Sequence, residues 1–350
     1  MSEPLVTLEQ QLPNAEVLVV TSAWPHVENP IYGIFVQREQ AALRELGVRA
    51  DVVFVRGYRS PFAYLLACVE LFRRGRDKNG YAVVHAYGGE ASLPALCYGS
   101  APLVVTYLGD DLLGTSSSEG LVPLPSRVRR AVIRALARRV NRTVTRSSAM
   151  EEALPEIVRC RNTILPAGVD ASIFQPVDHG QARRELGWLG VERVVLFAAD
   201  PDVPGKRYGL AREAVELARP RLPNVRLHVA RDVPPDQMPT MMAAADCLLL
   251  TSATEGSPNV VKEALMCNLP VVTVRVGDVD ETLRGVNPSW IRGSDPNDLA
   301  EALVACLESP MRSNGRCTAY RFTASSIAKR VLRVYEDAAV RPFRKLGESS

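Results

Sequence analysis

The chain has 350 residues, enough for two domains that each bury their own hydrophobic core. Its 42 Lys and Arg residues against 39 Asp and Glu residues leave a formal net charge of +3, which is too small to indicate a nucleic-acid-binding surface. The seven cysteines show no C-x-x-C spacing, so they indicate neither a disulfide framework nor a zinc site and favour a reducing, cytoplasmic location.

The first half of the chain alternates short, mostly β-branched runs with helical patterns. Residues 1–11, which precede the first run, are acidic and lack the pattern of a signal peptide. No apolar run approaches the roughly 18 residues of a spanning helix, so we expect a soluble protein. The alternation predicts a parallel, doubly wound sheet. We expect strands at residues 16–22, 50–56, 82–87, 102–109, 142–147 and 162–166.

Candidate ligand contacts lie in the loops that follow these strands, because ligands of open α/β sheets bind beyond the carboxyl ends of the strands. Gly33 follows the first strand and precedes an apolar helix start. His85 and Tyr87 end the third strand, and Gly88 permits close approach of the backbone to a ligand. The alternative for His85 is a structural histidine with both ring nitrogens satisfied, which is the commoner situation at a strand end.

Asp110 and Asp111 follow the fourth predicted strand. Two carboxylates at this place suggest a metal-binding D-x-D motif, but the two residues are adjacent. We therefore favour a turn or a cap at the end of the sheet, and we predict no metal site.

A basic segment runs from Arg127 to Arg142. Four of its arginines recur at helical spacing and predict one charged stripe, with an apolar face beside it. The stripe comprises Arg127, Arg130, Arg134 and Arg138, and the apolar face comprises Val128, Ala131, Val132, Ala135 and Leu136. The default interpretation is a solvated surface. The alternative is a peripheral contact with an anionic membrane or with a phosphate-bearing acceptor.

The second half repeats the alternation of strands and helices. We expect strands at residues 193–199, 225–231, 246–252, 270–276 and 289–292, and hence a second Rossmann-like domain. Lys206 and Arg207 follow the first of these strands, and Arg231 ends the second. From about Ser325 the chain is helical and basic.

Residues 255–272, E-G-S-P-N-V-V-K-E-A-L-M-C-N-L-P-V-V, place two carboxylates around a helix start. Ser257 predicts the N-cap and Pro258 the first helical position. Free backbone N–H groups over Gly256–Val260, which include that of Asn259, would meet the positive end of the helix dipole and form an anion site suited to a diphosphate.

The two glutamates suit the two ends of a nucleotide sugar. Glu255 stands just before the predicted anion site. Glu263 lies about 7.5 Å further along the helix axis, close to the distance from a pyrophosphate to a ribose. We expect the helix to end at Cys267, with Asn268 in the left-handed conformation. The alternative is an ordinary helix with a solvated glutamate pair.

Residues 251–272 resemble the signature of the retaining GT-B glycosyltransferases of glycosyltransferase family 4, P/T-S-x-x-E-G-x-x-x-x-x-x-E-A-x-x-x-G-x-P-V-V. Both glutamates match at the family's spacing, as do Pro270-Val271-Val272, while Asn268 replaces the usual Gly. Residues 166–176 resemble the family's interdomain segment I-P-N-G-V-D-x-x-x-F-x-P, with Ala167 in place of Asn.

The resemblance implies roles for the first-half candidates. Gly33 matches the Gly of P-x-x-G-x-F-V-x-x-Q, whose loop approaches the donor phosphates in one branch of the family. His85 matches the first histidine of V-H-x-H, which lies near the transferred sugar, and Tyr87 stands in place of the second. Leu108 replaces the histidine of T-x-H-G-x-D.

In the second half, Lys206 matches the lysine of G-R-x-x-x-x-K-G, which contacts the donor diphosphate. The family's arginine is missing, because Ala198-Ala199-Asp200 occupies its place, and Arg207 is the candidate replacement. Arg231 lies where the family has its base-contacting loop. The resemblance thus implies Glu255, Lys206 and His85 as catalytic, and as donor-binding Gly33, Lys206, Arg207, Arg231, Gly256, Ser257, Pro258, Asn259, Val260 and Glu263. On the acceptor side it leaves Tyr87, Gly88 and Asp110.

The resemblance implies a GT-B fold, in which two Rossmann-like domains with parallel doubly wound sheets face a central cleft. The expected boundaries are 1–170 for the acceptor domain, 171–324 for the nucleotide-sugar domain, and 325–350 for a terminal helix that returns to the first domain. The implied activity is transfer of a sugar from a UDP- or GDP-sugar to an acceptor hydroxyl with retention, without metal or other cofactor. A non-catalytic GT-B-like binding protein is the alternative, and a sugar-nucleotide epimerase or phosphorylase lacks its own signature here.

Overall fold

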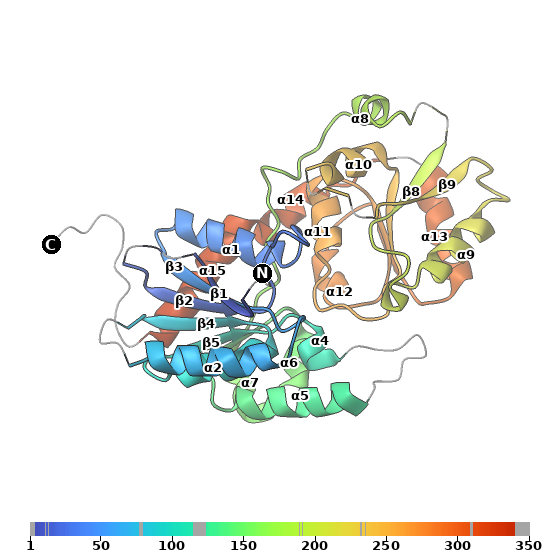
Figure 1. Cartoon of the computed structure of the whole chain (residues 1–350). Coiled ribbons are helices and arrows are strands. Elements are labelled where there is room, and N and C mark those ends of the chain that lie inside the picture. Colours follow the sequence, from blue (N-terminus) through green and yellow to red (C-terminus); the bar gives the residue numbers. More distant parts are fainter. Residues whose placement is uncertain are drawn as a thin grey trace. The chain divides into compact units, whose positions relative to one another are not determined.

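The computed structural model describes residues 4–10, 12, 14–76, 80–114, 124–188, 190, 192–231, 233–234, 236–308 and 311–339. These residues fall into two compact units (Figure 1). Unit 1 draws on Met1–Gly114, Leu124–Gly168 and Ala324–Ser350, and unit 2 on Val169–Thr323. The helix expected from about residue 325 is α15 (Ala324–Ala338) and belongs to unit 1. Residues 340–350 of that expected segment lie outside the described residues.

Unit 1 is built on one sheet with the strand order β1-β3-β2-β4-β5-β6-β7. Its strands are β1 (Val6–Gln10), β2 (Val17–Thr21), β3 (Ala50–Val55), β4 (Val83–Tyr87), β5 (Leu103–Thr106), β6 (Arg142–Thr145) and β7 (Asn162–Ile164). Strands β2 to β7 pair in parallel, as predicted. Strand β1 is antiparallel to β3 and was not predicted; it is an edge strand of five half-buried or exposed residues, so its apolar run is weak.

Helices cover both faces of this sheet, which confirms the doubly wound arrangement. The helices α1 (Ile34–Glu45) and α15 pack on one face. The other face carries α2 (Phe62–Arg74), α3 (Ser92–Tyr98) and α5 (Leu124–Ala137). The short helices α4 (Asp110–Leu113), α6 (Ser148–Ala153) and α7 (Glu156–Arg159) complete the unit.

The basic segment departs from its prediction in three ways. Its helix, α5, ends at Ala137, so Arg138 of the predicted stripe lies beyond the helix, and Arg142 begins strand β6, as the strand pattern predicts. The expected apolar face is mostly exposed, since α5 packs on the sheet through Ile133 and Ala137 instead. Arg130 is not part of a solvated stripe, because its Nη1 donates to the carbonyl of Leu113 at 2.8 Å. The periodicity indicated a helix but not which face is buried.

Unit 2 is built on a parallel sheet with the order β12-β11-β10-β8-β9. Its strands are β8 (Arg193–Phe197), β9 (Val225–Val229), β10 (Cys247–Leu250), β11 (Val271–Val274) and β12 (Ser289–Arg292), all close to their predicted ranges. The helices are α8 (His179–Glu185), α9 (Tyr208–Ala218), α10 (Met238–Ala244), α11 (Asn259–Met266), α12 (Val279–Thr282), α13 (Pro296–Glu308) and α14 (Gly315–Ala319). Within the described ranges, no helix is long and apolar enough to cross a bilayer.

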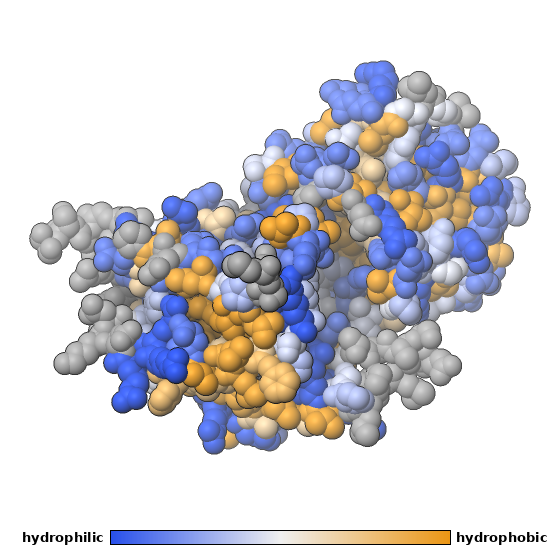
Figure 2. Space-filling view, in the orientation of Figure 1, coloured by the Kyte–Doolittle hydropathy of each residue, from blue (hydrophilic) through white to orange (hydrophobic). Residues whose placement is uncertain are grey.

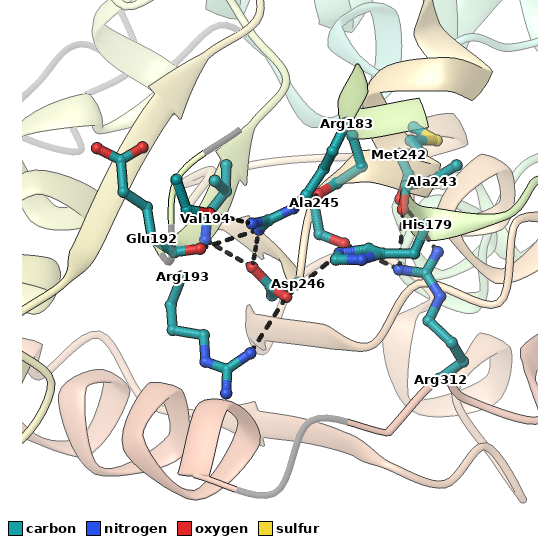
Figure 3. A network of polar contacts seen from close by, with 12 residues as sticks. His179, Arg183, Glu192, Arg193, Val194, Met242, Ala243, Ala245, Asp246 and Arg312 are labelled. Carbon is teal, nitrogen blue, oxygen red and sulfur yellow. Dashed lines mark hydrogen bonds and ion pairs between the residues drawn. The ribbon is translucent and has the colours of Figure 1, made fainter. Parts of the chain in front are cut away.

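A network around Asp246 holds the amino end of this sheet (Figure 3). Asp246, whose side chain is 6 % exposed, accepts hydrogen bonds from Arg183 Nη2 and from the backbone N–H of Val194, both at 2.7 Å. Arg183 also donates to the carbonyl of Ala244 at 3.1 Å. Because Asp246 precedes β10 and Arg183 lies on α8, the network ties this helix to the sheet edge away from the carboxyl ends of the strands, and we assign it a structural role.

Candidate active site

Three loops meet at the carboxyl edge of the unit 2 sheet, because β8, β10 and β11 are neighbouring parallel strands. Thr251, just after β10, donates from Oγ1 to the carbonyl of Lys206 at 2.9 Å. The N–H of Ala253 donates to the carbonyl of Gly205 at 2.8 Å. Gly277, after β11, packs so closely that a Cβ there would lie 2.9 Å from the carbonyl oxygen of Gly256. The three loops therefore form one continuous surface.

Lys206 and Glu255 form an ion pair on this surface. Lys206 Nζ lies 2.6 Å from Glu255 Oε1, and the two side chains are 35 % and 19 % exposed. The structure thus brings together the two residues that the sequence singled out as catalytic in this half of the chain. The ammonium is already partnered, so an anionic ligand would share it with the carboxylate.

Arg207 has a different environment from Lys206. Its guanidinium donates to the carbonyls of Thr251 at 2.6 Å and Ser252 at 3.2 Å, and to Ser294 Oγ at 3.0 Å. Partial burial lowers the pKa of Arg207 from its usual value. Its backbone is left-handed, with φ of 49°, where it joins a single 3-10 turn to the start of α9. Arg207 therefore binds the β10 loop to the β8 loop.

Helix α11 begins one residue later than predicted. Pro258 is its N-cap, and Ser257 makes no capping hydrogen bond to the helix. Instead Ser257 Oγ donates to Asp278 Oδ2 at 2.5 Å, because Asp278 lies in the adjacent loop after β11. The predicted end at Cys267 and the left-handed Asn268, with φ of 55°, are confirmed.

A buried lysine supports the same loop, and sequence reasoning missed it. Lys262 on α11 is 0 % exposed, and its Nζ donates to Ser257 Oγ at 2.9 Å. Burial raises the pKa of Asp278, while the nearby Lys262 ammonium and the hydrogen bond from Ser257 lower it. The signal was available, since a lysine between apolar residues on a short core helix needs a partner.

Some buried polar atoms at this edge have no hydrogen-bond partner among the described residues. They are Ser252 Oγ at the end of β10, Asn259 Oδ1 at the start of α11 and Asp278 Oδ1. Buried polar groups are nearly always satisfied, so such a cluster is typical of a place where a ligand completes the hydrogen bonding. Glu263 lies one turn further along α11 and is half-buried.

Arg231 pairs with the loop after β8. Its guanidinium contacts Asp200 at 3.3 Å and Asp202 at 2.7 Å. The contact of Arg231 with a nucleotide base stays a prediction, and a base would share the guanidinium with these two carboxylates.

In unit 1, His85 and Tyr87 belong to the core. His85 is 0 % exposed, and its ring nitrogens lie 2.7 Å from Tyr335 Oη and 2.7 Å from Thr106 Oγ1. Tyr87 is equally buried and donates to Glu39 Oε1 at 2.6 Å. The structure thus supports the structural alternative for His85. It also corrects the acceptor-side prediction for Tyr87, because neither side chain reaches a surface where a sugar could touch it.

The remaining unit 1 candidates lie in tightly packed loops. Gly33 is left-handed, with φ of 69°, and a Cβ there would lie 2.2 Å from the backbone carbon of Ala23. Gly88 is buried, also with positive φ. Asp110 is exposed at the start of α4. Asp111 is buried and accepts from the backbone N–H groups of Gly89, Leu108, Gly109 and Leu112, which confirms the cap predicted for this acidic pair.

Comparisons with solved structures define the fold class. Sucrose-phosphate synthase from Thermosynechococcus elongatus aligns with a TM-score of 0.75 at 18 % identity, over 92 % of this chain and 98 % of that one. Anabaena HepE in complex with UDP-glucose aligns with a TM-score of 0.67 at 19 % identity, over 92 % and 99 %. The chain has the GT-B fold of these proteins.

Family comparisons then give the membership. Residues 5–173 match the description "Glycosyltransferase Family 4", and residues 200–309 match "Glycosyl transferases group 1". The chain belongs to glycosyltransferase family 4, and it is a glycosyltransferase.

Relatives named D-inositol 3-phosphate glycosyltransferase share about three residues in ten with the chain. The protein from Acidothermus cellulolyticus is 28 % identical over 75 % of this chain and 68 % of its own length. The protein from Thermobispora bispora is 32 % identical over 59 % of this chain and 57 % of its own length. The first alignment therefore covers about two thirds of that relative's length, and the second covers less than two thirds.

Proposed function

We propose that the enzyme transfers a sugar from a nucleoside diphosphate sugar to an acceptor hydroxyl with retention of anomeric configuration. The observation that carries the proposal is the Lys206–Glu255 pair beside the start of α11, on the loops that join β8, β10 and β11 to their helices. A cation and a helix N-terminus together suit a diphosphate, and the unpartnered buried hydroxyl of Ser252 can donate a hydrogen bond to it.

Each group in this arrangement has a chemical task. The bond between the anomeric carbon and the diphosphate oxygen breaks, and a bond from the same carbon to the acceptor oxygen forms on the same face. The leaving diphosphate takes the acceptor's proton. Lys206 and the N–H groups of residues 259–260 stabilise the charge that develops on the diphosphate. Glu263 holds the ribose hydroxyls, and Glu255 fixes Lys206 and the donor sugar.

We propose UDP as the donor nucleotide. HepE, whose fold the chain shares, was crystallised with UDP and with UDP-glucose. The acceptor is a hydroxyl of a carbohydrate, a lipid-linked sugar or a small molecule. No divalent metal takes part in this proposal, since the cation and the helix start take its place at the diphosphate.

A ligand-stabilisation screen tests the proposal. UDP-, GDP- and ADP-sugars would be added to the full chain, and the melting temperature followed. A donor at about 100 times its dissociation constant adds ~2.7 kcal/mol of stability. We expect UDP-sugars to raise the melting temperature with EDTA present, and NMR of the product to show the anomeric configuration of the donor. Stabilisation only by GDP- or ADP-sugars, a need for manganese, or an inverted product would contradict the respective part of the proposal.

A further inference from the structure

Helix α2 of unit 1 has its amphipathic character reversed. At 100° per residue, five of its large apolar side chains fall within an arc of about 120°. These side chains point to solvent: Phe62 is 67 % exposed, Leu65 58 %, Leu66 53 %, Val69 50 % and Phe72 57 %. The residues that α2 buries against the sheet are Ala63, Ala67 and Leu71. Figure 2 shows the outcome as a continuous hydrophobic patch at the place that α2 occupies in Figure 1.

The apolar surface extends from α2 toward strand β1. A groove of about 450 Å³ lies between them, lined on one side by Leu66, Val69 and Arg73 and on the other by Leu5, Val6 and Leu8. A water-soluble helix normally turns its small or polar residues outward, so a ridge and a groove of this kind mark a contact surface. We call the exposed face of α2 together with this groove the α2 face.

The charges on the α2 face are basic. Arg73 and Arg76 are exposed at the C-terminal end of the helix, and the Arg76 guanidinium lies 5.9 Å from the centre of the Phe72 ring. Glu70 is the one acidic residue in the α2 sequence, and it pairs with Arg74 at 2.8 Å. The apolar ridge therefore ends in cations that have no carboxylate on α2 left to pair with.

We propose that the α2 face docks on an anionic lipid bilayer. A bilayer offers both chemistries in one surface, because hydrocarbon receives the side chains of the ridge and lipid phosphates receive the arginines. A second copy of the chain fits less well, since a two-fold contact through α2 would bury two sets of arginines without carboxylates to pair with them. The proposal goes beyond sugar transfer and does not depend on which donor the enzyme uses.

Co-sedimentation of the full chain with vesicles tests the proposal without any nucleotide sugar. The vesicles are pure phosphatidylcholine, or an equal mixture of phosphatidylcholine and phosphatidylglycerol. We expect binding to the mixed vesicles that decreases as salt rises. Leu65→Gln with Leu66→Gln should lower the partition at least tenfold. Arg73→Gln with Arg76→Gln should lower it about fivefold for each arginine.

The matched control is Val128→Gln with Val132→Gln on α5. These valines are 57 % and 52 % exposed, which is close to the exposure of Leu65 and Leu66. They lie on the basic helix for which the sequence analysis considered membrane contact. We expect this variant to bind as the wild type does. Circular dichroism and the melting temperature check that each variant is folded. Three results would overturn the proposal: no binding of the wild type to the mixed vesicles, normal binding of the folded α2 variants, or a wild-type dimer in solution that the α2 substitutions convert to a monomer.

Discussion

Glu255 lies 2.6 Å from the ammonium of Lys206, so the carboxylate competes with any diphosphate for that cation. We predict that Glu255→Gln binds UDP about two- to fivefold more tightly, because a partly exposed ion pair is worth ~0.5–1 kcal/mol. Turnover should nevertheless fall at least tenfold, since the amide no longer fixes Lys206 and the donor sugar. Calorimetry with UDP and steady-state kinetics measure the two effects.

The matched control is a substitution of Glu263, the second carboxylate of the same segment. Glu263→Ala should weaken UDP about tenfold through lost ribose hydrogen bonds. The two substitutions therefore act on UDP affinity with opposite sign. Equal weakening of UDP by both would contradict the roles assigned to these glutamates.

Substitutions of Arg207 distinguish a structural role of its hydrogen bonds from a role of its charge in binding the diphosphate. Its guanidinium donates to two carbonyls of the β10 loop, and a lysine cannot reproduce that fork. We predict that Arg207→Lys and Arg207→Ala lower the unfolding free energy similarly, by about 1–3 kcal/mol, and weaken UDP to a similar extent. Urea denaturation and calorimetry check this. If Arg207 instead supplies the family's missing diphosphate cation, Arg207→Lys retains most of the UDP affinity while Arg207→Ala loses it.

The sequence predicted some site residues and misplaced others, for physical reasons. The proximity of Lys206 and Glu255 follows from a parallel sheet, because loops after neighbouring strands share one edge. Ser257 was predicted as a helix cap from the preference of serine for that position. Its hydroxyl instead donates a hydrogen bond to Asp278, which is distant in sequence. The burial of His85 depends on Tyr335 of α15, a partner 250 residues away that no local pattern reveals.

At the scale of elements, the buried Lys262 holds the loop before α11 to the loop before α12. We predict that Lys262→Met lowers the unfolding free energy of unit 2 by about 3–5 kcal/mol, because it leaves the buried Asp278 without its cation. Ser257→Ala removes only the bridging hydroxyl and should cost about 1 kcal/mol. Urea denaturation of these variants, of Asp278→Asn, and of Lys262→Met combined with Asp278→Asn completes the test. A double variant as unstable as the sum of its single variants would show that the two charges do not interact.

Helix α15 is held to the unit 1 sheet in part through His85, and this gives a pH dependence. Burial, and then the Arg146 charge, lower the pKa of His85 well below 6.5. The unfolded chain therefore binds this proton more readily, so stability is fully present above about pH 6.5 and falls as the pH decreases below it. The slope from one such histidine is at most ~1.4 kcal/mol per pH unit.

Urea denaturation between pH 8 and pH 5 measures this slope. With Trp188→Phe and Trp290→Phe as background, fluorescence reports on unit 1 through the buried Trp24. His85→Gln should be less stable at neutral pH and show a shallower slope. His179 and His228, whose pKa values burial also lowers, lie in unit 2 and are present in both proteins. An unchanged slope in His85→Gln would contradict the role of this proton.

The elements themselves were largely predictable. Apolar β-branched runs predicted strands β2 to β12, because helices cover both faces of a parallel sheet, although the edge strands β7, β9 and β12 are mostly half-buried. Strand β1 and the buried face of α5 were not predictable in this way. An edge strand has one neighbour and a weaker apolar pattern, and an alanine-rich helix can pack on a sheet through either of two apolar faces.

At the scale of the whole molecule, family membership establishes a glycosyltransferase with the GT-B fold. The central claim beyond this is that unit 2 binds the diphosphate of the donor at Lys206 and the start of α11. In this account the diphosphate and the nucleoside bind different residues. Two ligands that differ only in the diphosphate therefore test the claim.

Calorimetric titration of UDP and of uridine into the wild type, Lys206→Ala and the surface control Arg221→Ala makes that comparison. Arg221 is an exposed cation that pairs with Glu301 and Glu308 elsewhere in unit 2. We predict that Lys206→Ala weakens UDP at least tenfold, as expected for a charge-assisted hydrogen bond of about 1.5–3 kcal/mol, and leaves uridine unchanged. Arg221→Ala should bind both ligands as the wild type does. Unchanged UDP affinity in Lys206→Ala, or an equal loss for UDP and uridine, would contradict the assignment of the diphosphate to this site.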